Sequence, residues 1–312
     1  MSEKFAELGA PRRIWAVAAV HGELDRLTAL HDHLASRFSV RDRVIYLGNY
    51  LGVDSRHNGA VFDEVLAFRS ALLSKDGMVP SDIIYLRGPA EEAWMRLLRL
   101  QFAPMPLQSI EKLLMSGVEA YLRLYGVSIN DTKSMARAGS VAITRWTNQL
   151  RALQRMSPGH ESLMCGMRRA AYTYAPPGQE KILFVPAGFD PSRSLEDQGE
   201  SLWWTSATFR VAGRAQNIYS RIVRGFDSVN TGPILQEAAV TLDAGCGRGG
   251  PLMCGCFTPN GKLTEIIAVG GQGVLETAPF EREAANDFFV ADDAASAADY
   301  ESVPQYGLEA SA

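Results

Sequence analysis

The chain has 312 residues, of which 46% are hydrophobic and 21% are charged, and its formal net charge at pH 7 is −4. This composition is typical of a folded globular protein and excludes disordered and fibrous chains. A negative balance without a basic footprint predicts no nucleic-acid partner. No apolar run approaches the roughly 20 residues that span a bilayer, and the first twenty residues lack the order of a signal peptide, so we expect no membrane contact and a cytoplasmic location.

Three strand–turn–helix units open the chain. The first strand is followed by His21-Gly22 and by leucines at helical spacing, and the third runs through Arg87-Gly88 into a helix that starts near Glu91. The three strands are predicted at residues 13–19, 43–47 and 83–86. Because strands and helices alternate, we expect an α/β fold with a predominantly parallel, layered sheet.

The rest of the chain divides into a helical segment, a strand-rich segment and a tail. Residues 92–169 show helical periodicity and are predicted to be a helical insertion (a cap) within a single domain at 12–270. Further strands are predicted at 181–185, 222–224, 240–243, 251–257 and 263–269, the last two joined by a hairpin turn. Residues 274–312 are acidic and alanine-rich, which predicts a partly disordered tail; Phe288-Phe289 and Tyr300 are its candidates for docking onto the body or a partner.

The four cysteines do not form a recognisable zinc motif. Cys165 stands alone, and the spacing of Cys246, Cys254 and Cys256 fits no common ligand pattern. Cys254 and Cys256 would share one face of a strand. Buried free thiols are therefore expected.

A ligand crevice is expected beyond the carboxyl ends of the strands, where loops converge in an open α/β sheet. The five strand ends to inspect are residues 18–22, 48–52, 87–91, 185–188 and 224–227. Their order and framing resemble the calcineurin-like metallophosphoesterases, above all the bacterial serine/threonine protein phosphatase and diadenosine tetraphosphatase branch, whose strand ends read GDxHG, GDxxDRG, GNHE, V-H-A-G and G-H. Residues 184–191, Trp203-Trp204, 242–246 and 249–252 are also similar, and the resemblance covers residues 12–270.

The resemblance implies a metallophosphoesterase-type α/β/β/α sandwich with a helical insertion, and a crevice in which two divalent ions about 3.5–4 Å apart would activate water and clamp a phosphate. Carried over position by position, only the histidine of the first motif is retained, as His21. The other motif positions hold Ala19 and Asn49 for the two aspartates, Pro89 for the asparagine, Ala90 for the catalytic histidine, and Pro186 and Phe226 for the late histidines.

These replacements predict that the metal-binding and catalytic residues are lost. Alanine, proline and phenylalanine offer no side-chain ligand, and an amide at the bridging position lacks the charge that holds two dications together. His21 is then expected to be a hydrogen-bonded histidine at a strand–helix turn. Metal entry through His57, Asp54 or Asp190 is the alternative.

The second motif departs as well. Its DRG portion reads Gly52-Val53-Asp54, so the expected phosphate-binding arginine is missing. Arg56 or Arg87 could meet an anion instead, but ordinary surface or strand-end roles are the simpler interpretation for both.

Three functions follow from this pattern. The first is a pseudophosphatase without cofactor that binds a protein or a small ligand. The second is a divergent phosphoesterase, a phosphoric monoester or dinucleoside polyphosphate hydrolase that acts on a phosphoprotein or nucleotide phosphate. It would use a remodelled site that binds Mn or another divalent metal weakly, and main-chain amides of the strand-end glycines would bind the phosphate. The third is self-association or assembly with a protein partner through an apolar cluster, for which core packing is the competing interpretation. That cluster comprises Trp94, Leu97, Leu98, Leu100 and Phe102.

Overall fold

The computed structural model describes residues 4–174, 176, 180–204, 209, 219–229, 232–235, 238–273 and 275–279. The chain divides after Pro279 into two units, and all of these residues belong to the first. The docking candidates Phe288-Phe289 and Tyr300 lie outside the described residues. Among the helices that the structure describes, none is long and apolar enough to cross a membrane.

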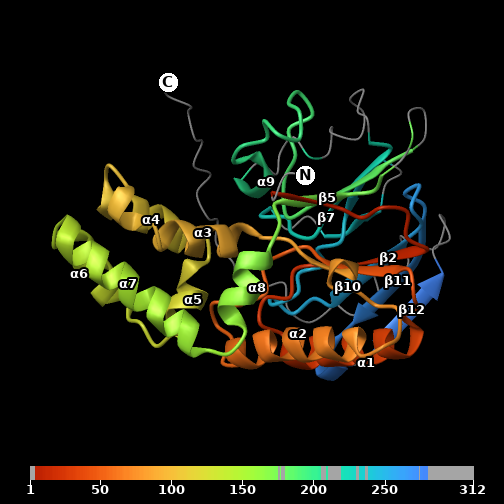
Figure 1. Ribbon diagram of the computed structural model, residues 1–312, viewed down its shortest axis with the longest axis horizontal. Coiled ribbons are helices and arrows are strands. Elements are labelled where there is room, and N and C mark those ends of the chain that lie inside the picture. Colours follow the sequence, from red (N-terminus) through yellow and green to blue (C-terminus); the bar gives the residue numbers. More distant parts are fainter. Residues whose placement is uncertain are drawn as a thin grey trace, which may run out of the picture. The chain divides into compact units, whose positions relative to one another are not determined.

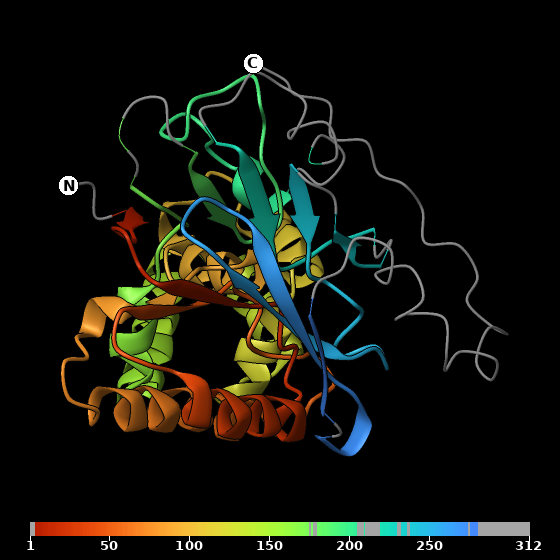
Figure 2. The ribbon, with the colours of Figure 1, turned by 90° about the vertical axis from the view of Figure 1, so that its right-hand side faces the viewer.

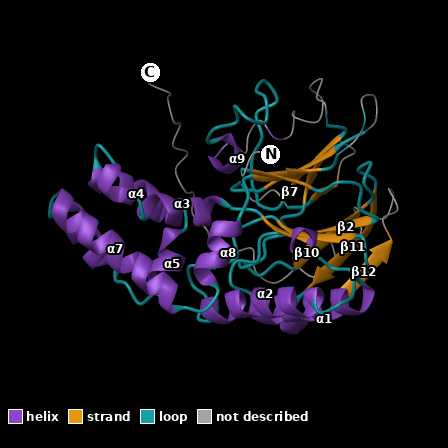
Figure 3. Cartoon of the chain, viewed as in Figure 1, coloured by secondary structure: helices purple, strands orange, loops and turns teal. Residues whose placement is uncertain are grey.

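Two mixed β-sheets carry the fold (Figures 1 and 3). The first has the order β12-β11-β10-β2-β3-β4, with β12 at Leu275–Pro279, β11 at Leu263–Val269, β10 at Leu252–Phe257, β2 at Arg13–Val17, β3 at Asp42–Tyr46 and β4 at Ile83–Tyr85. The second has the order β1-β5-β6-β7-β9-β8, with β1 at Phe5–Glu7, β5 at Ala170–Tyr172, β6 at Ile182–Val185, β7 at Arg221–Arg224, β9 at Ala239–Thr241 and β8 at Ile234–Leu235.

Helices cover one face of the first sheet (Figure 2). The chain between β4 and β5 is also helical. The helices α1 (Leu24–Arg37) and α2 (Asn58–Leu73) run along the outer face of the first sheet. The segment between β4 and β5 contains α3 at Pro89–Leu97, α4 at Pro106–Met115, α5 at Val118–Leu124, α6 at Ile129–Arg137, α7 at Ser140–Met156 and α8 at His160–Gly166. The short helix α9 (Ser201–Trp204) follows β6.

The two sheets pack face to face, and the alternation of side chains along each strand decides which face a residue occupies. Phe184 of β6 meets Phe257 of β10 with ring centroids 5.7 Å apart, so these side chains point between the sheets. Leu183 and Val185 point the other way and pack with Leu202 of α9. The layers are therefore helix, sheet, sheet, helix, which is the α/β/β/α class expected from the sequence.

The expectation of a predominantly parallel sheet is wrong. Among the described strands, β2, β3 and β4 are parallel neighbours, but β10, β11 and β12 join them through antiparallel pairs. The second sheet likewise contains both kinds of pair. Short hairpin connections place consecutive late strands antiparallel, whereas the early strands are joined through helices that return the chain to the same end.

Two further predictions from the sequence differ from the structure, one at the start of the tail and one in the apolar cluster. The tail was expected to begin at residue 274, but Leu275–Pro279 forms β12, which pairs with β11. The sequence of this segment does not predict a strand, because its hydrogen bonds depend on a partner earlier in the chain. In the apolar cluster of the helical segment, Trp94, Leu97, Leu98 and Leu100 are buried, whereas Phe102 is 78% exposed. Four of the five thus belong to the core.

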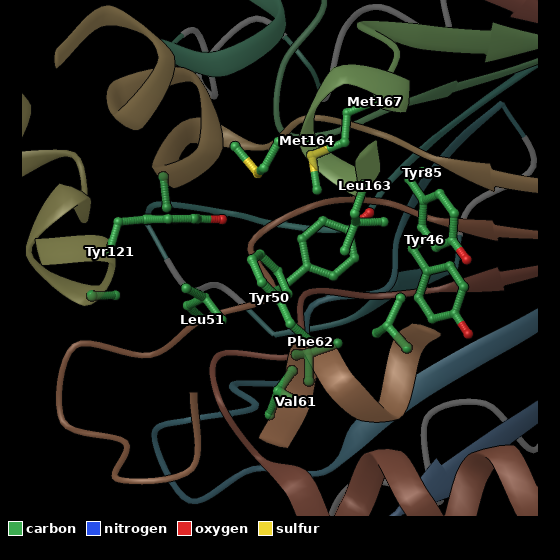
Figure 4. Close-up of a cluster of buried hydrophobic side chains, with 14 of the residues drawn as sticks. Tyr46, Tyr50, Leu51, Val61, Phe62, Tyr85, Tyr121, Leu163, Met164 and Met167 are labelled. Carbon is green, nitrogen blue, oxygen red and sulfur yellow. The ribbon is translucent and has the colours of Figure 1, made fainter. Parts of the chain in front are cut away.

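One continuous core joins the first sheet, its covering helices and the helical segment (Figure 4). Tyr46 and Tyr85, from neighbouring strands, stack at 5.3 Å, and Tyr50 meets Phe62 of α2 at 6.0 Å. Tyr121 of α5 reaches the same Phe62 at 6.1 Å. Each such buried ring contributes about 1.5–3 kcal/mol, so this cluster ties the helical segment to the strand ends. Cys246, Cys254 and Cys256 are also in this core, as free thiols, whereas Cys165 is a free thiol at an exposed position, so the expectation of a buried thiol is wrong for Cys165.

A buried His31 makes the stability of this core depend on pH. Its Nδ1 lies 2.6 Å from Glu64 Oε1, and Tyr46 Oη lies 2.7 Å from its Nε2. This arrangement fits a neutral ring that donates to Glu64 and accepts from Tyr46. Burial lowers the pKa of His31 below 6.5, against the opposing hydrogen bond and charge of Glu64.

We therefore expect the free energy of unfolding to fall between about pH 7 and pH 5. A folded state with a lowered histidine pKa binds fewer protons than the unfolded chain below pH 6.5, so acid favours unfolding. Urea unfolding at the two pH values measures the effect, and His31→Asn should make the difference smaller. An equal or larger difference in the variant would contradict this role.

Candidate functional site

The carboxyl ends of strands from both sheets meet through backbone hydrogen bonds. Ala19 N, after β2, donates to Gly225 O at 3.0 Å, and His21 N donates to Asn49 O at 3.0 Å. Phe226 N, after β7, donates to Pro186 O, after β6, also at 3.0 Å. These hydrogen bonds bring the candidate positions of four strand ends together at the place where the sequence predicts a crevice. Helix α3 adds the remaining two positions, Pro89 and Ala90, at its first turn, where Ala90 N donates to Asn49 Oδ1.

Hydrogen bonds fix both the backbone and the side chain of Asn49. It has a left-handed backbone with φ of 55°, which is uncommon for a residue other than glycine. Its backbone N–H donates to Glu91 at 2.7 Å, and its side-chain Oδ1 accepts from Ala90 N at 3.2 Å. The amide oxygen that replaces a bridging carboxylate in the family resemblance therefore serves as an acceptor for the start of α3.

His21 also has a left-handed backbone, with φ of 49°. Its ring lies against Phe226, with the centroids 5.4 Å apart. Its Nε2 is buried and has no hydrogen-bond partner among the described residues. The expected hydrogen bond is made by the backbone N–H and not by Nε2. Burial lowers the pKa of His21 to about 4, which the charge of Asp243 opposes and that of Arg248 assists, so the ring is neutral at pH 7.

The remaining crevice positions are apolar and packed. Ala19 is 1% and Ala90 6% exposed, Pro89 and Pro186 are buried, and Phe226 is half-buried. These side chains do not fit a binuclear metal centre, because they provide no ligand atom beside His21 and an Asn49 oxygen that is already bonded. Within the described part of the chain, no three His, Cys, Asp or Glu side chains gather in a way that could hold a metal ion.

The alternative metal ligands are not brought together. His57 and Asp54 are exposed in the loop before α2. Asp190 lies after β6, where it accepts hydrogen bonds from Ser192 N at 2.9 Å and Ser192 Oγ at 2.6 Å. These bonds lower the pKa of Asp190, and they satisfy its carboxylate within its own turn.

Glu91, for which no role is predicted from the sequence, accepts hydrogen bonds from both loops that carry the candidate positions Asn49 and Ala90. It is fully buried and accepts from Asn49 N, from Gly88 N at 2.9 Å, from Tyr50 N at 3.2 Å and from Tyr121 Oη at 2.6 Å. Burial raises its pKa, while these four donors hold it down. An acidic residue in the first turn of a helix that begins with Gly-Pro is a recognisable capping signal, and that signal could have identified it.

Two buried aspartates order the loops on the other side of the crevice. Asp243 accepts from Asp227 N and Gly245 N, each at 2.9 Å. Asp227 itself pairs with the buried Arg224 at 2.8 Å. Asp243 thus connects the loop after β9 to the loop after β7, which carries Phe226, while Asp227 pairs with an arginine from the end of its own strand.

Comparison with known proteins gives likenesses of fold alone. No protein-family model matches the sequence, and no curated protein matches it. Among solved structures, one described as "a putative diadenosine tetraphosphatase" is 15% identical with a TM-score of 0.47, covering 89% of this chain and 99% of the other. A protein serine/threonine phosphatase from Saccharomyces cerevisiae with similarity to human phosphatase PP5 is 10% identical with a TM-score of 0.43, covering 89% and 84%.

Proposed function

We propose that this chain is a phosphatase-like protein that binds a protein or small ligand at the strand-end crevice and does not hydrolyse phosphate esters. The observation that carries the proposal is the occupation of the crevice by Ala19, Ala90, Pro186 and Phe226, which are packed side chains without a metal ligand. Hydrolysis through two metal ions needs several carboxylate and imidazole ligands at these positions. A cytoplasmic location remains part of the proposal.

The electrostatics of the crevice support a site that is stable without metal. Clustered carboxylates in a buried crevice repel one another unless cations neutralise them. Here the neutral Asn49 and the apolar Ala19 and Ala90 remove that repulsion, and His21 is neutral at pH 7 because its pKa is about 4. A protein with this crevice folds without a divalent ion, and chelators should leave its stability unchanged.

The test measures metal content and turnover together. Protein purified without chelator is expected to carry less than about a tenth of an equivalent of transition metal by elemental analysis. Added manganese should produce no hydrolysis of a phosphate monoester or of a dinucleoside polyphosphate above that of the His21→Ala variant. Manganese-dependent hydrolysis that disappears in His21→Ala would overturn the proposal and favour the divergent phosphoesterase.

A further inference from the structure

Four arginines gather where the end of β4 meets α3 and α9, outside the crevice positions. Arg87 follows β4, Arg96 and Arg99 lie at the end of α3, and Arg169 precedes β5. The helices α3 and α9 are in contact, and α9 contributes Trp203 and Trp204. We call these four residues the arginine cluster.

Trp203 holds two of the guanidinium groups. Arg169 Cζ lies 4.7 Å and Arg87 Cζ 5.4 Å from the centre of its ring, within the range of cation–π attraction. The indole is itself fixed, because its Nε1 donates to Arg87 O at 2.7 Å. Arg96 lies in the same way 5.9 Å from the ring of Trp204.

The backbone fixes the spacing of Arg87 and Arg169. Arg87 N donates to Arg168 O at 2.8 Å, and Arg168 N donates to Tyr85 O at 2.8 Å, so the chain before β5 runs beside the end of β4. Residues 87 and 169 are therefore placed together by main-chain bonds and not by a side-chain contact. A ligand that uses both would need little additional ordering of the protein.

The cluster has more positive than negative charge. Two carboxylates face its four guanidinium groups: Glu92 pairs with Arg87 at 2.9 Å and with Arg96 at 2.8 Å, and Glu200 pairs with Arg96 at 2.7 Å. No ion pair involves Arg99 or Arg169 within the described part of the chain. Burial lowers the pKa of Arg87, Glu92 opposes this, and the charges of Arg169, Arg99 and Arg96 add to it.

Donor groups in the cluster also lack acceptors. Within the described part of the chain, Arg169 Nε is buried without a hydrogen-bond partner, although Nη2 of the same guanidinium donates to Gly199 O. Arg87 Nε reaches Glu92 without the alignment of a hydrogen bond. Unpaired buried donors are costly, and an oxyanion is the group that would satisfy them. Solvent reaches the cluster, because the side chains of Arg87 and Arg96 are 20% and 38% exposed.

We propose that the arginine cluster around Trp203 is a binding site for a dianionic phosphate group. Among the described residues, two guanidinium charges of the cluster, those of Arg99 and Arg169, have no carboxylate paired with them, which matches a dianion. The planar donor fork of arginine fits phosphate oxygens in pairs. The proposal concerns a site beside the crevice. It holds whether or not the crevice hydrolyses esters.

Titration of the full chain with inorganic phosphate in the presence of a chelator tests this site. We expect a saturable change in tryptophan fluorescence that chloride at equal ionic strength does not produce, and that Trp203→Phe abolishes or strongly reduces. Arg169→Gln should weaken binding at least about tenfold through the loss of a charged hydrogen-bond donor. Arg99→Gln, at an exposed position where folding is not at risk, should weaken it about threefold through charge alone.

Arg12→Gln is the matched control, because Arg12 is an exposed arginine before β2, at the opposite end of the strands. It should bind phosphate as the wild type does. Tighter binding of O-phosphoserine than of free phosphate would assign the site to a phosphate ester, and the reverse would assign it to the free ion. Absence of saturable binding, or equal losses in Arg12→Gln and Arg99→Gln, would overturn the proposal.

Discussion

Replacement of Glu91 by alanine is expected to lower the free energy of unfolding by about 3–5 kcal/mol. Three backbone N–H groups, of Asn49, Tyr50 and Gly88, would lose their buried acceptor together with the hydroxyl of Tyr121. Burial raises the pKa of Glu91, so the charge itself adds no stability. The loss arises from donors left without partners.

Urea unfolding of three variants separates these contributions. Glu91→Gln keeps the size of the side chain and can keep an oxygen toward Asn49 N and Gly88 N, while its amide nitrogen faces the donor Tyr50 N and the hydroxyl of Tyr121, which can accept. It should therefore cost less than alanine but more than Tyr121→Phe. Tyr121→Phe removes one donor of four and should cost about 1 kcal/mol. Glu111→Ala, at an exposed position on α4, is the control and should stay within about 0.5 kcal/mol of the wild type. A Glu91→Gln protein as stable as the control would contradict this account.

Gly48→Ala is expected to be the second severe substitution. Gly48 follows β3 with φ of 94°, and a Cβ there would lie 2.4 Å from Gly88 N and 2.6 Å from its Cα. Because the overlapping atoms of Gly88 belong to the backbone, no rotation of a side chain can relieve the overlap. The loops after β3 and β4 would have to separate, which would also displace Asn49.

Gly126→Ala provides the matched control, because Gly126 has φ of 69° and no described residue comes within 4 Å of the added Cβ. Both variants carry the cost of a left-handed alanine, about 1–2 kcal/mol. Gly48→Ala should cost at least about 3 kcal/mol more, or prevent folding, because of the overlap with Gly88. Thermal and urea unfolding measure the difference. Equal costs would show that the two loops separate easily.

The sequence alone located most of the strands that the structure describes. Apolar runs bounded by glycine and proline predicted β2, β3, β4, β6, β7, β9, β10 and β11, because residues buried on both faces leave a continuous hydrophobic signal. It did not reveal the three-residue strands β1 and β5, the two-residue strand β8 or any of β12. Such short segments are strands only because a distant partner supplies their hydrogen bonds.

The chemistry of the crevice shows the same division. The sequence determined which ligand atoms are present, since Ala19, Ala90, Pro186 and Phe226 have none wherever they lie. Only the tertiary structure decided that these positions meet, that Asn49 Oδ1 accepts from Ala90 N, and that the ring of His21 lies against Phe226. The structure likewise brings Arg87 and Arg169 together from segments far apart in the chain. Main-chain hydrogen bonds between segments far apart in the chain set these distances, and a sequence read in order contains no signal for them.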